Sequence, residues 1–247
     1  MIQKSDFEGK TALVTGAGSG IGRVLVERLV GLGTKVIAVS QTQEKLDSLK
    51  KELGDLVVPV ACNLADWDET EARVKPYCDS VDFLINNAGY AHMKPIEEIP
   101  KEEVDKILNI NVRAPILLSA LVSKGMKERR NGVIVNVSSV ASMKAENRHV
   151  PYAASKAALD MITNCCALEF GPYNIRVNSV NPTLVWTDMA KINWNDPKAR
   201  SALLSKIPLN KFVEIREVID PIIFLLSNQS SMISGTNIPI DGGLSAC

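Results

Sequence analysis

Much of what would direct a protein to a nucleic acid, a metal ion or a membrane is absent from this sequence. Its 28 Lys and Arg balance 28 Asp and Glu, so there is no basic excess of the kind that binds nucleic acids. The five cysteines are odd in number and none has CxxC spacing, which argues against a disulfide framework or a zinc site. No apolar run is expected to span a bilayer, and the polar N-terminus leaves no room for a signal peptide. We therefore expect a cytoplasmic protein with no metal, nucleic-acid or membrane partner.

What is present is a regular alternation of short apolar runs and longer helical patterns. The chain has 247 residues, 46% of them apolar, which is enough for one large domain with a substantial core. The apolar residues of the short runs are consecutive, as in strands covered on both faces. The predicted strands are Thr11–Thr15, Lys35–Val39, Val57–Cys62, Val81–Ile85, Val133–Val137, Arg176–Val180 and Asn237–Ile240, and the helices between them include Gly22–Leu32, Thr42–Leu53, Lys101–Lys124 and Tyr152–Phe170. The pattern predicts an α/β fold, a single doubly wound parallel-sheet domain over residues 1–247.

The first predicted strand runs into a glycine-rich turn that opens a helix. Glycines permit positive φ angles and a close approach of phosphate to the backbone, and the helix N-terminus offers free N–H groups and a positive dipole end. Because the turn lies in the first βα unit, it predicts a dinucleotide-binding Rossmann fold rather than a flexible loop. The residues expected to hold the cofactor here are Gly16, Gly18, Ser19, Gly20, Ile21 and Gly22.

The end of the second strand bears on which dinucleotide is bound. NAD sites usually place an Asp or Glu about 20 residues after the glycines, against the ribose 2′-hydroxyl. Here the residues are Ser40, Gln41 and Thr42, which carry no charge to repel a 2′-phosphate. Arg23 follows the glycines and is expected to reach that phosphate, although a solvated surface position would also fit it. The sequence therefore favours NADP(H).

Tyr152 and Lys156 stand four residues apart on a predicted helix and therefore project from one face. A tyrosine titrates near pH ~10, but a lysine ammonium at about 4 Å would favour the phenolate by on the order of 4 kcal/mol. We expect Lys156 to lower the pKa of Tyr152 toward the range where acid–base catalysis is efficient. Ser139 follows a buried strand, where its hydroxyl would donate to a carbonyl oxygen that gains charge. These side chains predict carbonyl–alcohol chemistry.

These motifs, in this order, resemble those of the classical short-chain dehydrogenase/reductase family over nearly the whole chain. They are the TGAGSGIG turn, Asn86–Gly89 after the fourth strand, Asn111 within NINV, Ser139, the Tyr152 and Lys156 pair, and Ile238–Gly243. The resemblance implies hydride transfer between a nicotinamide and a carbonyl or secondary alcohol, with Tyr152 as the acid–base group. It also implies that Lys156 binds the ribose and that Asn111 holds a water in a proton relay to Tyr152.

The resemblance assigns cofactor positions outside the glycine turn as well. One set backs the adenosine side and another lies beside the nicotinamide: Asn87, Ala88, Gly89, Pro182, Val185 and Thr187. Two positions depart from the family pattern. Asn63, followed by Leu64, stands where the family commonly has an Asp that contacts adenine, and its amide would keep one of those hydrogen bonds. Thr183 replaces a common glycine.

Further stretches resemble the dicarbonyl and L-xylulose reductase branch of the family, among them SQTQEKLDSL, Cys62–Trp67 and IPLNKF. The likeness implies NADPH-dependent reduction of L-xylulose to xylitol and of small α-dicarbonyls such as diacetyl, with Ser139 and Tyr152 at the carbonyl oxygen. His149 and Trp194 are candidates for the substrate wall. Residues 186–208 interrupt the strand–helix alternation and are expected to form a loop-like lid over the substrate. The family likeness also implies a homotetramer with dihedral symmetry.

Two other interpretations of the sequence stay open. A 3-oxoacyl carrier-protein reductase or a sugar-alcohol dehydrogenase of the same family would have the same glycine turn and catalytic residues. A non-catalytic NADPH-binding regulator on the same fold is the second, because a fold does not determine a function. Such a regulator would be expected to have lost Tyr152, Lys156 or Ser139, and this chain keeps all three.

Overall fold

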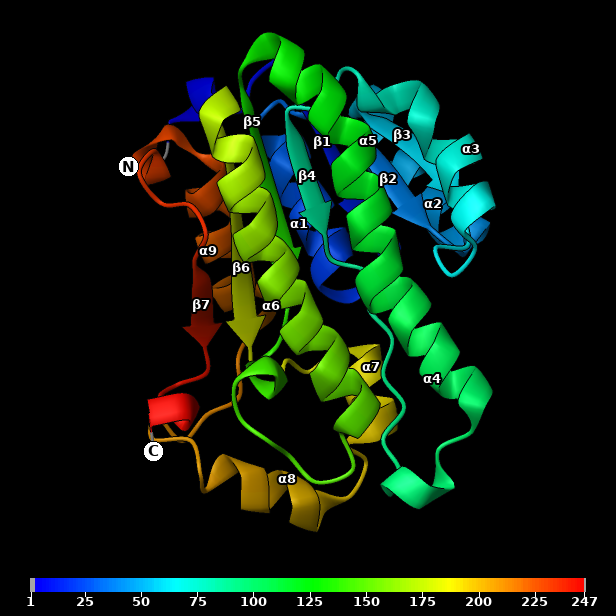
Figure 1. Cartoon of the computed structure of the whole chain (residues 1–247), viewed down its shortest axis with the longest axis vertical. Coiled ribbons are helices and arrows are strands. Elements are labelled where there is room, and N and C mark those ends of the chain that lie inside the picture. The colour runs from blue at the N-terminus through cyan, green and yellow to red at the C-terminus, as the bar shows by residue number, and fades with distance from the viewer. Residues whose placement is uncertain (1–2, 247) are drawn as a thin grey trace.

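A single parallel sheet of seven strands organises the fold in the computed structural model, which describes residues 3–246 without the side chains of Asp188, Met189 and Asn193. The strand order is β3-β2-β1-β4-β5-β6-β7, and every pairing is parallel (Figure 1). The strands are β1 Thr11–Thr15, β2 Lys35–Ser40, β3 Val57–Ala61, β4 Phe83–Asn86, β5 Gly132–Val137, β6 Ile175–Pro182 and β7 Asn237–Ile240. The predicted doubly wound α/β fold is confirmed.

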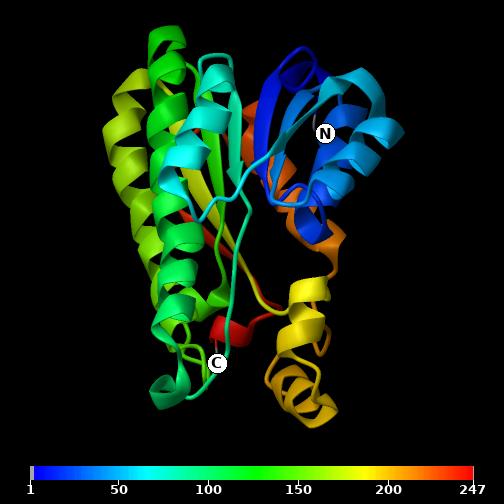
Figure 2. The same cartoon turned by 90° about the vertical axis from the view of Figure 1, so that its right-hand side faces the viewer.

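Strands β1 to β6 each contribute to two cores, because successive side chains point to opposite faces of a sheet. In β1, Ala12 and Val14 pack into the core shared with three helices, α1 Gly20–Gly31, α2 Gln43–Leu53 and α9 Ile215–Leu226. Leu13 between them packs into the opposite core, shared with α3 Trp67–Cys78, α5 Ala114–Arg129 and α6 Val150–Phe170. Figures 1 and 2 show α5 and α6 side by side on one face of the sheet, with α9 on the other. Burial on both faces explains why the strand residues are apolar at consecutive positions.

The predicted helix Lys101–Lys124 is present but interrupted. It comprises α4 Lys101–Leu108, a π-helical turn at Asn109–Arg113 and then α5. By length and composition the combined helix Lys101–Arg129 is apolar enough to cross a membrane, so the expectation that no such segment exists is wrong on that criterion. Half of its most apolar window is buried inside the protein, where α5 packs against α3 and β5, which is the environment of a core helix.

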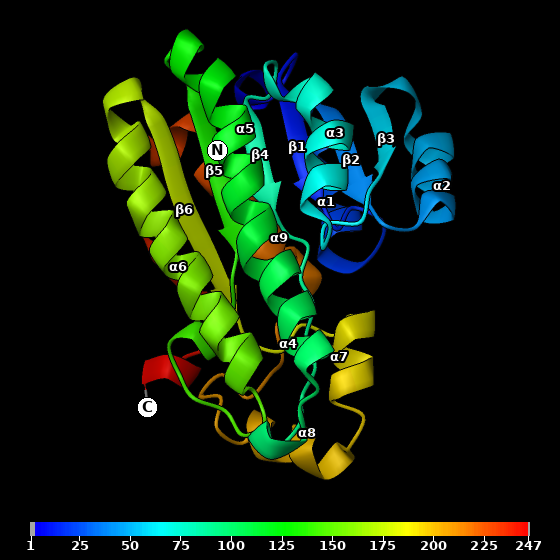
Figure 3. The ribbon, with the colours of Figure 1, turned by 45° about the vertical axis from the view of Figure 1, so that its right-hand side comes forward.

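The segment expected to be a loop-like lid contains two short helices, α7 Asp188–Asn193 and α8 Pro197–Leu204. The polar residues that interrupt the apolar pattern are helix caps. The Thr187 hydroxyl accepts from the Ala190 N–H at 3.4 Å, and the Asp196 carboxylate accepts from the Lys198 N–H at 2.9 Å. Figure 3 shows α7 and α8 beyond the carboxyl ends of the strands.

The order of the strands defines a switch point between β1 and β4. From β1 the chain proceeds to β2 and β3 on one side, and then returns to β4 and continues outward on the other side. The connections that leave β1 and β4 therefore diverge, and they leave a crevice at the carboxyl edge of the sheet. In open α/β sheets this crevice is where ligands bind.

Candidate active site

A cavity of about 320 Å³ opens at this switch point. Its walls come from the glycine turn after β1, the segment after β4, the end of β5, the start of α6 and the connection from β6 into α7 and α8. The structure brings together fifteen of the predicted site residues as its lining: Gly16, Ser19, Gly20, Ile21, Asn87, Ala88, Gly89, Ser139, His149, Tyr152, Lys156, Pro182, Val185, Thr187 and Trp194. They come from six separate parts of the chain, so the folded sheet is what places them around one space.

The remaining predicted site residues do not line this cavity. They are Gly18, Gly22, Arg23, Ser40, Gln41, Thr42, Asn63, Leu64 and Asn111. Gly18 and Ser40 lie together at its edge, because a Cβ atom added at Gly18 would be 2.8 Å from Ser40 Oγ. Asn111 lies under the wall and is fully buried.

The glycine turn has the geometry that the sequence predicts. Gly16 and Gly20 have φ angles of +66° and +54°, which a side chain would disfavour. A Cβ atom at Gly22 would lie 2.2 Å from the Gly16 carbonyl oxygen, so only glycine fits where α1 begins. Asn87 fastens the turn from the β4 side, since its Nδ2 donates to the Thr15 carbonyl at 2.8 Å. The turn is thus a compact loop that requires glycine at the start of α1.

Arg23 is not held ready for a phosphate in the structure. Its guanidinium pairs with two acids, Glu27 at 3.2 Å on the same helix and Glu52 on α2. A different cation lies over the turn instead. The Lys45 side chain crosses Gly18, since a Cβ atom added there would be 3.1 Å from Lys45 Cβ and 3.4 Å from its Cδ. The signal for Lys45 in the sequence was weak, because it lies on an exposed helix turn after the predicted motif.

Asn63 and Leu64 close the loop after β3. The Asn63 side-chain oxygen accepts from the Ala65 N–H at 3.2 Å, and its Nδ2 group is the donor of the same amide. Leu64 packs against the core of α3 and α5. The loop is therefore ordered by its own contacts, and the amide keeps a donor for a neighbouring ring.

The pKa of Tyr152 differs from the expectation. Burial raises this pKa, and the side-chain hydrogen bond with Ser139 offsets only part of the rise. Burial also lowers the pKa of Lys156 to about 8, with the nearby Asp160 carboxylate acting in the opposite direction. The prediction that the pKa of Tyr152 is lowered is wrong for this structure, because the loss of hydration is the largest effect and only the hydrogen bond with Ser139 opposes it. At neutral pH the phenol is therefore a proton donor.

Asn111 lies within the π-helical turn between α4 and α5. Its side-chain oxygen accepts from the Tyr90 N–H at 2.8 Å, and its amide donates to the Tyr90 carbonyl at 2.9 Å and to Ser155 Oγ at 3.0 Å. Both amide protons are thus in use. Any role of Asn111 toward a water must come from its main chain, in a turn type that often marks functional sites.

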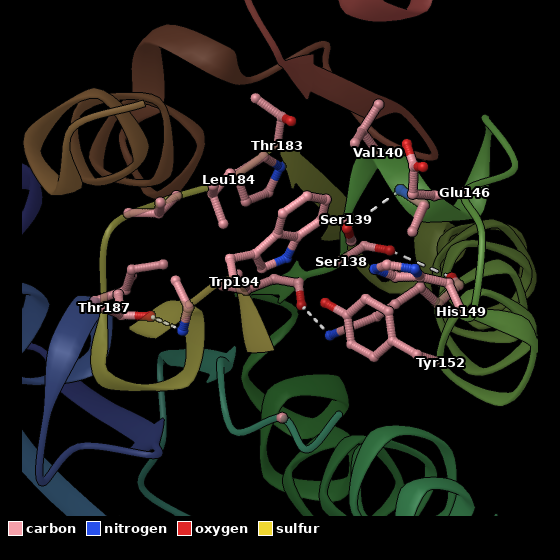
Figure 4. Close-up of a pocket in the computed structure, with 18 of the residues that line it drawn as sticks. Ser138, Ser139, Val140, Glu146, His149, Tyr152, Thr183, Leu184, Thr187 and Trp194 are labelled. Carbon is pink, nitrogen blue, oxygen red and sulfur yellow. Dashed lines mark hydrogen bonds between the residues drawn. The ribbon is translucent and has the colours of Figure 1, made fainter. Parts of the chain in front are cut away.

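His149 and Trp194 lie next to each other in the lining of the pocket, near Tyr152 (Figure 4). The His149 ring centre is 5.9 Å from that of Trp194 and 6.2 Å from that of Tyr152. His149 Nδ1 lies 2.6 Å from the Asn147 carbonyl oxygen, so Nδ1 carries the proton and Nε2 is the acceptor. Thr183 is buried, and its N–H donates to the Ile240 carbonyl at 3.1 Å, which ties the β6 end to β7.

Reasoning from the sequence named no individual residue for much of the cavity wall. It placed Ala190, Leu203 and Lys206 only within the predicted lid, and Thr183 only as a departure from the family pattern. The other wall residues that it did not name are Met93, Val137, Ser138, Val140, Ala141, Lys144, Ala145, Glu146, Leu184 and Leu244. Lys144 and Leu244 illustrate the reason, because Lys144 Nζ donates to the Leu244 carbonyl at 2.7 Å across a hundred positions of sequence. No local pattern signals such a pairing.

Known proteins with similar sequences are reductases by name. A family model described as short chain dehydrogenase matches residues 10–198. The protein named L-xylulose reductase from Mus musculus is 50% identical over 239 residues, which cover 96% of this chain and 97% of the relative. The protein named Carbonyl reductase (NADPH) 2 from Sus scrofa is 42% identical over 239 residues, again covering 96% of this chain and 97% of the relative.

Solved structures agree with these sequence matches. The crystal structure of levodione reductase superposes with a TM-score of 0.92 at 31% sequence identity, covering 98% of this chain and 99% of that one. The two proteins thus share the same overall fold.

Proposed function

We propose that this chain, which belongs to the short chain dehydrogenase family, is an NADPH-dependent reductase of L-xylulose and of small α-dicarbonyls. The observation that carries the proposal is the convergence of Ser139, Tyr152 and Lys156 on one cavity beside the glycine turn. The relatives named L-xylulose reductase and Carbonyl reductase (NADPH) 2 support the substrate class. Alternative activities are another short-chain reductase, such as a 3-oxoacyl carrier-protein reductase or a sugar-alcohol dehydrogenase, and a non-catalytic regulator.

The residues present fit a nicotinamide dinucleotide. The glycine turn with Gly16, Gly20 and Gly22 lies at the start of α1, and pyrophosphate binds helix N-termini through their free backbone N–H groups. We propose that Asn87–Gly89 back the adenosine side and that Pro182, Val185 and Thr187 hold the nicotinamide end. When bound, the nicotinamide supplies the hydride for the carbonyl carbon. The remaining chemistry is that of this chain's own side chains.

Tyr152 acts in this proposal as the acid for the carbonyl oxygen. Its raised pKa keeps the phenol protonated at neutral pH, so the O–H proton is available as the oxygen gains charge. Ser139 donates a second hydrogen bond to the same oxygen and stabilises that charge. The Ser139 hydroxyl oxygen already accepts from the Ala141 N–H at 3.2 Å, which orients its own proton toward the cavity.

Lys156 and Asn111 restore the proton to Tyr152. Lys156 is 3% exposed and its pKa of about 8 lies near neutrality, so its ammonium gives up and regains a proton at little cost. We propose that it also binds the cofactor ribose. In this proposal a main-chain group of Asn111, in the π-helical turn, forms a hydrogen bond with a water molecule, and that water connects Lys156 with solvent.

The preference for NADPH rests on the absence of an acidic side chain at the end of β2 and on a nearby lysine. Ser40, Gln41 and Thr42 include no acid, so a 2′-phosphate meets no repulsion. We propose that Lys45, which crosses Gly18 beside Ser40, binds the 2′-phosphate, and that Arg23 has a smaller part because Glu27 and Glu52 pair with it. Asn63 and Leu64 then border the adenine ring.

The substrate is expected to lie against a wall formed by His149 and Trp194. His149 Nε2 accepts a hydrogen bond, because Nδ1 carries the proton, and a sugar ketone offers hydroxyl donors next to its carbonyl group. Trp194 supplies an apolar wall at 5.9 Å from the His149 ring. We propose that α7 and α8, within residues 186–208, close over this space as a lid.

The proposal extends to assembly and location. The outer faces of α5 and α6 expose Ile116, Met161 and Leu168, the last at 81%, and we propose that they pack between subunits of a homotetramer. A cytoplasmic location is supported by the free thiols of Cys62 and Cys78, which suit a reducing compartment.

The test is a set of absorbance assays with purified protein. NADPH and, separately, NADH are mixed with L-xylulose, with diacetyl and with an acetoacetyl thioester, and Tyr152→Phe serves as the inactive control. Oxidation of NADPH by the sugar or by diacetyl is expected. Turnover of the thioester alone would assign the acyl carrier-protein chemistry, and turnover with NADH alone would overturn the cofactor preference. No turnover with any pair, with NADPH still bound, would favour the regulator.

A further inference from the structure

A buried carboxylate beneath the site has no part in the chemistry described so far. Asp160 lies on α6, one helical turn after Lys156, and is 8% exposed. It does not line the cavity. A buried carboxylate destabilises a fold unless hydrogen bonds or a nearby opposite charge compensate for its lost hydration. Its partners therefore show what it does.

The first set of partners forms a directed chain of hydrogen bonds to Ser139. Asn181, at the end of β6, donates from Nδ2 to Asp160 Oδ2 at 2.8 Å and to Ser142 Oγ at 2.9 Å. The same Nδ2 also donates to the Ser139 carbonyl oxygen at the longer distance of 3.3 Å, so the two protons of the amide serve three acceptors. The Ser142 hydroxyl, which accepts from Asn181, then donates to the Ser139 carbonyl oxygen at 2.7 Å. Three short hydrogen bonds thus connect the carboxylate to the backbone of a residue that faces the substrate.

The second partner is a charge. Lys156 precedes Asp160 by four residues, so the two side chains are neighbours on the helix. The groups that face Lys156 from neighbouring elements are uncharged: Nζ donates to the Val137 carbonyl on β5 at 2.9 Å, and Gly89 after β4 lies beside it. On its own helix the only other titratable neighbour is Tyr152, whose ring centre is 5.7 Å away. Among residues 3–246, Asp160 is the charge that opposes the effect of burial on this ammonium.

We propose that Asp160 is a positioning residue for the reductase reaction, holding the Ser139 backbone through Asn181 and Ser142 and the Lys156 ammonium through its negative charge. The inference rests on the proposed function, because it assigns a role relative to Ser139 and Lys156. It accounts for a buried charge that a purely structural position would fill with an apolar side chain at lower cost. Neither role requires Asp160 to touch substrate or cofactor.

Two variants separate the two roles. Asp160→Asn keeps an oxygen that accepts from Asn181 but removes the charge. We expect its kcat near pH ~6 to stay close to that of the wild type, and its loss of activity at high pH to begin about one pH unit lower. Ser142→Ala keeps the charge and removes the 2.7 Å hydrogen bond to the Ser139 carbonyl oxygen, which leaves Ser139 only the longer bond from Asn181. We expect kcat to fall about twofold to tenfold at every pH, with no shift of the profile.

Ser123→Ala is the matched control for the serine substitution. Ser123 lies on α5, and its hydroxyl also donates to a backbone carbonyl, that of Ala120, at 2.8 Å. A pH profile of Asp160→Asn that superposes on the wild type overturns the electrostatic role. A kcat of Ser142→Ala equal to that of Ser123→Ala overturns the relay to Ser139. Because Ser142 is half-buried, its alanine variant is expected to fold.

A measurement without substrate distinguishes failure of this inference from failure of the proposed function. Amide hydrogen exchange of the peptide containing Ser138–Met143 is expected to be faster in Ser142→Ala than in Ser123→Ala. Equal exchange overturns the relay whatever the enzyme reduces. A wild-type protein that reduces none of the carbonyl substrates would overturn the proposed function, and faster exchange in Ser142→Ala would then still support the hydrogen-bonded chain.

Discussion

Lys156 donates its ammonium hydrogen bond to the carbonyl oxygen of Val137, at 2.9 Å, and not to the Tyr152 hydroxyl. Its Nζ atom is 5.7 Å from the centre of the Tyr152 ring. The ammonium therefore anchors the start of α6 to the end of β5, and it leaves the half-buried phenol beside the cavity protonated. This arrangement suits a reductase, in which Tyr152 begins each cycle as a proton donor.

Tyr152→Phe is expected to lower kcat by several orders of magnitude while NADPH binding is retained, because only the O–H group is removed. The Phe ring keeps the packing against His149. The measurements are steady-state kinetics with L-xylulose and the fluorescence change of NADPH on binding. Near-normal turnover in the variant would show that another group supplies the proton.

The rate of reduction is expected to decline above about pH 8. Burial lowers the pKa of Lys156 to about 8, so the ammonium is present below that pH and lost above it. The pKa of Tyr152 is raised, so its proton is kept through the same range. The measurement is kcat at saturating NADPH from about pH 6 to about pH 10.

Lys156→Arg provides the control for this profile, because a guanidinium stays charged throughout. The variant is expected to be much slower, since a guanidinium does not give up a proton and the longer side chain fits the site poorly, but its remaining activity is expected to lack the decline near pH ~8. A decline at the same pH in both proteins would assign it to a group other than Lys156.

Lys45→Gln is expected to raise the Kd of NADPH about tenfold and to leave that of NADH unchanged, because one charged contact with the 2′-phosphate is lost. Arg23→Gln is the matched variant on the neighbouring helix. Its effect is expected to be smaller, since Glu27 and Glu52 already pair with the guanidinium. Titration calorimetry with both nucleotides measures the difference. A larger effect of Arg23→Gln than of Lys45→Gln would show that Arg23 is the main partner of the 2′-phosphate.

Gly22→Ala is expected to lower the free energy of unfolding by about 3 kcal/mol and to abolish NADPH binding. The new Cβ atom would lie 2.2 Å from the Gly16 carbonyl oxygen, a backbone atom that cannot rotate away. Gly31→Ala tests the same change at the other end of α1, where a Cβ atom meets nothing within 4 Å. That variant is expected to gain about 0.5–1 kcal/mol. Urea denaturation compares the two, and equal effects would contradict the steric argument.

Local sequence patterns determined the strands, the spacing of the catalytic pair and the glycine turn of this protein. The runs of consecutive apolar residues predict the strands, because a strand buried on both faces needs apolar side chains at successive positions. The four-residue spacing of Tyr152 and Lys156 places both on one face of a helix because of the helix repeat. The glycine turn is likewise local, since its steric demand involves Gly16 and Gly22 within one loop.

Only the tertiary structure decided the properties that depend on partners distant in sequence. The pKa of Tyr152 rises because several elements together exclude water from it, and Arg23 is diverted because α2 brings Glu52 beside it. Asp160 acquires a role only when β6 places Asn181 against α6. Hydration and charge pairing are sums over neighbours in space, and the sequence alone does not specify those neighbours.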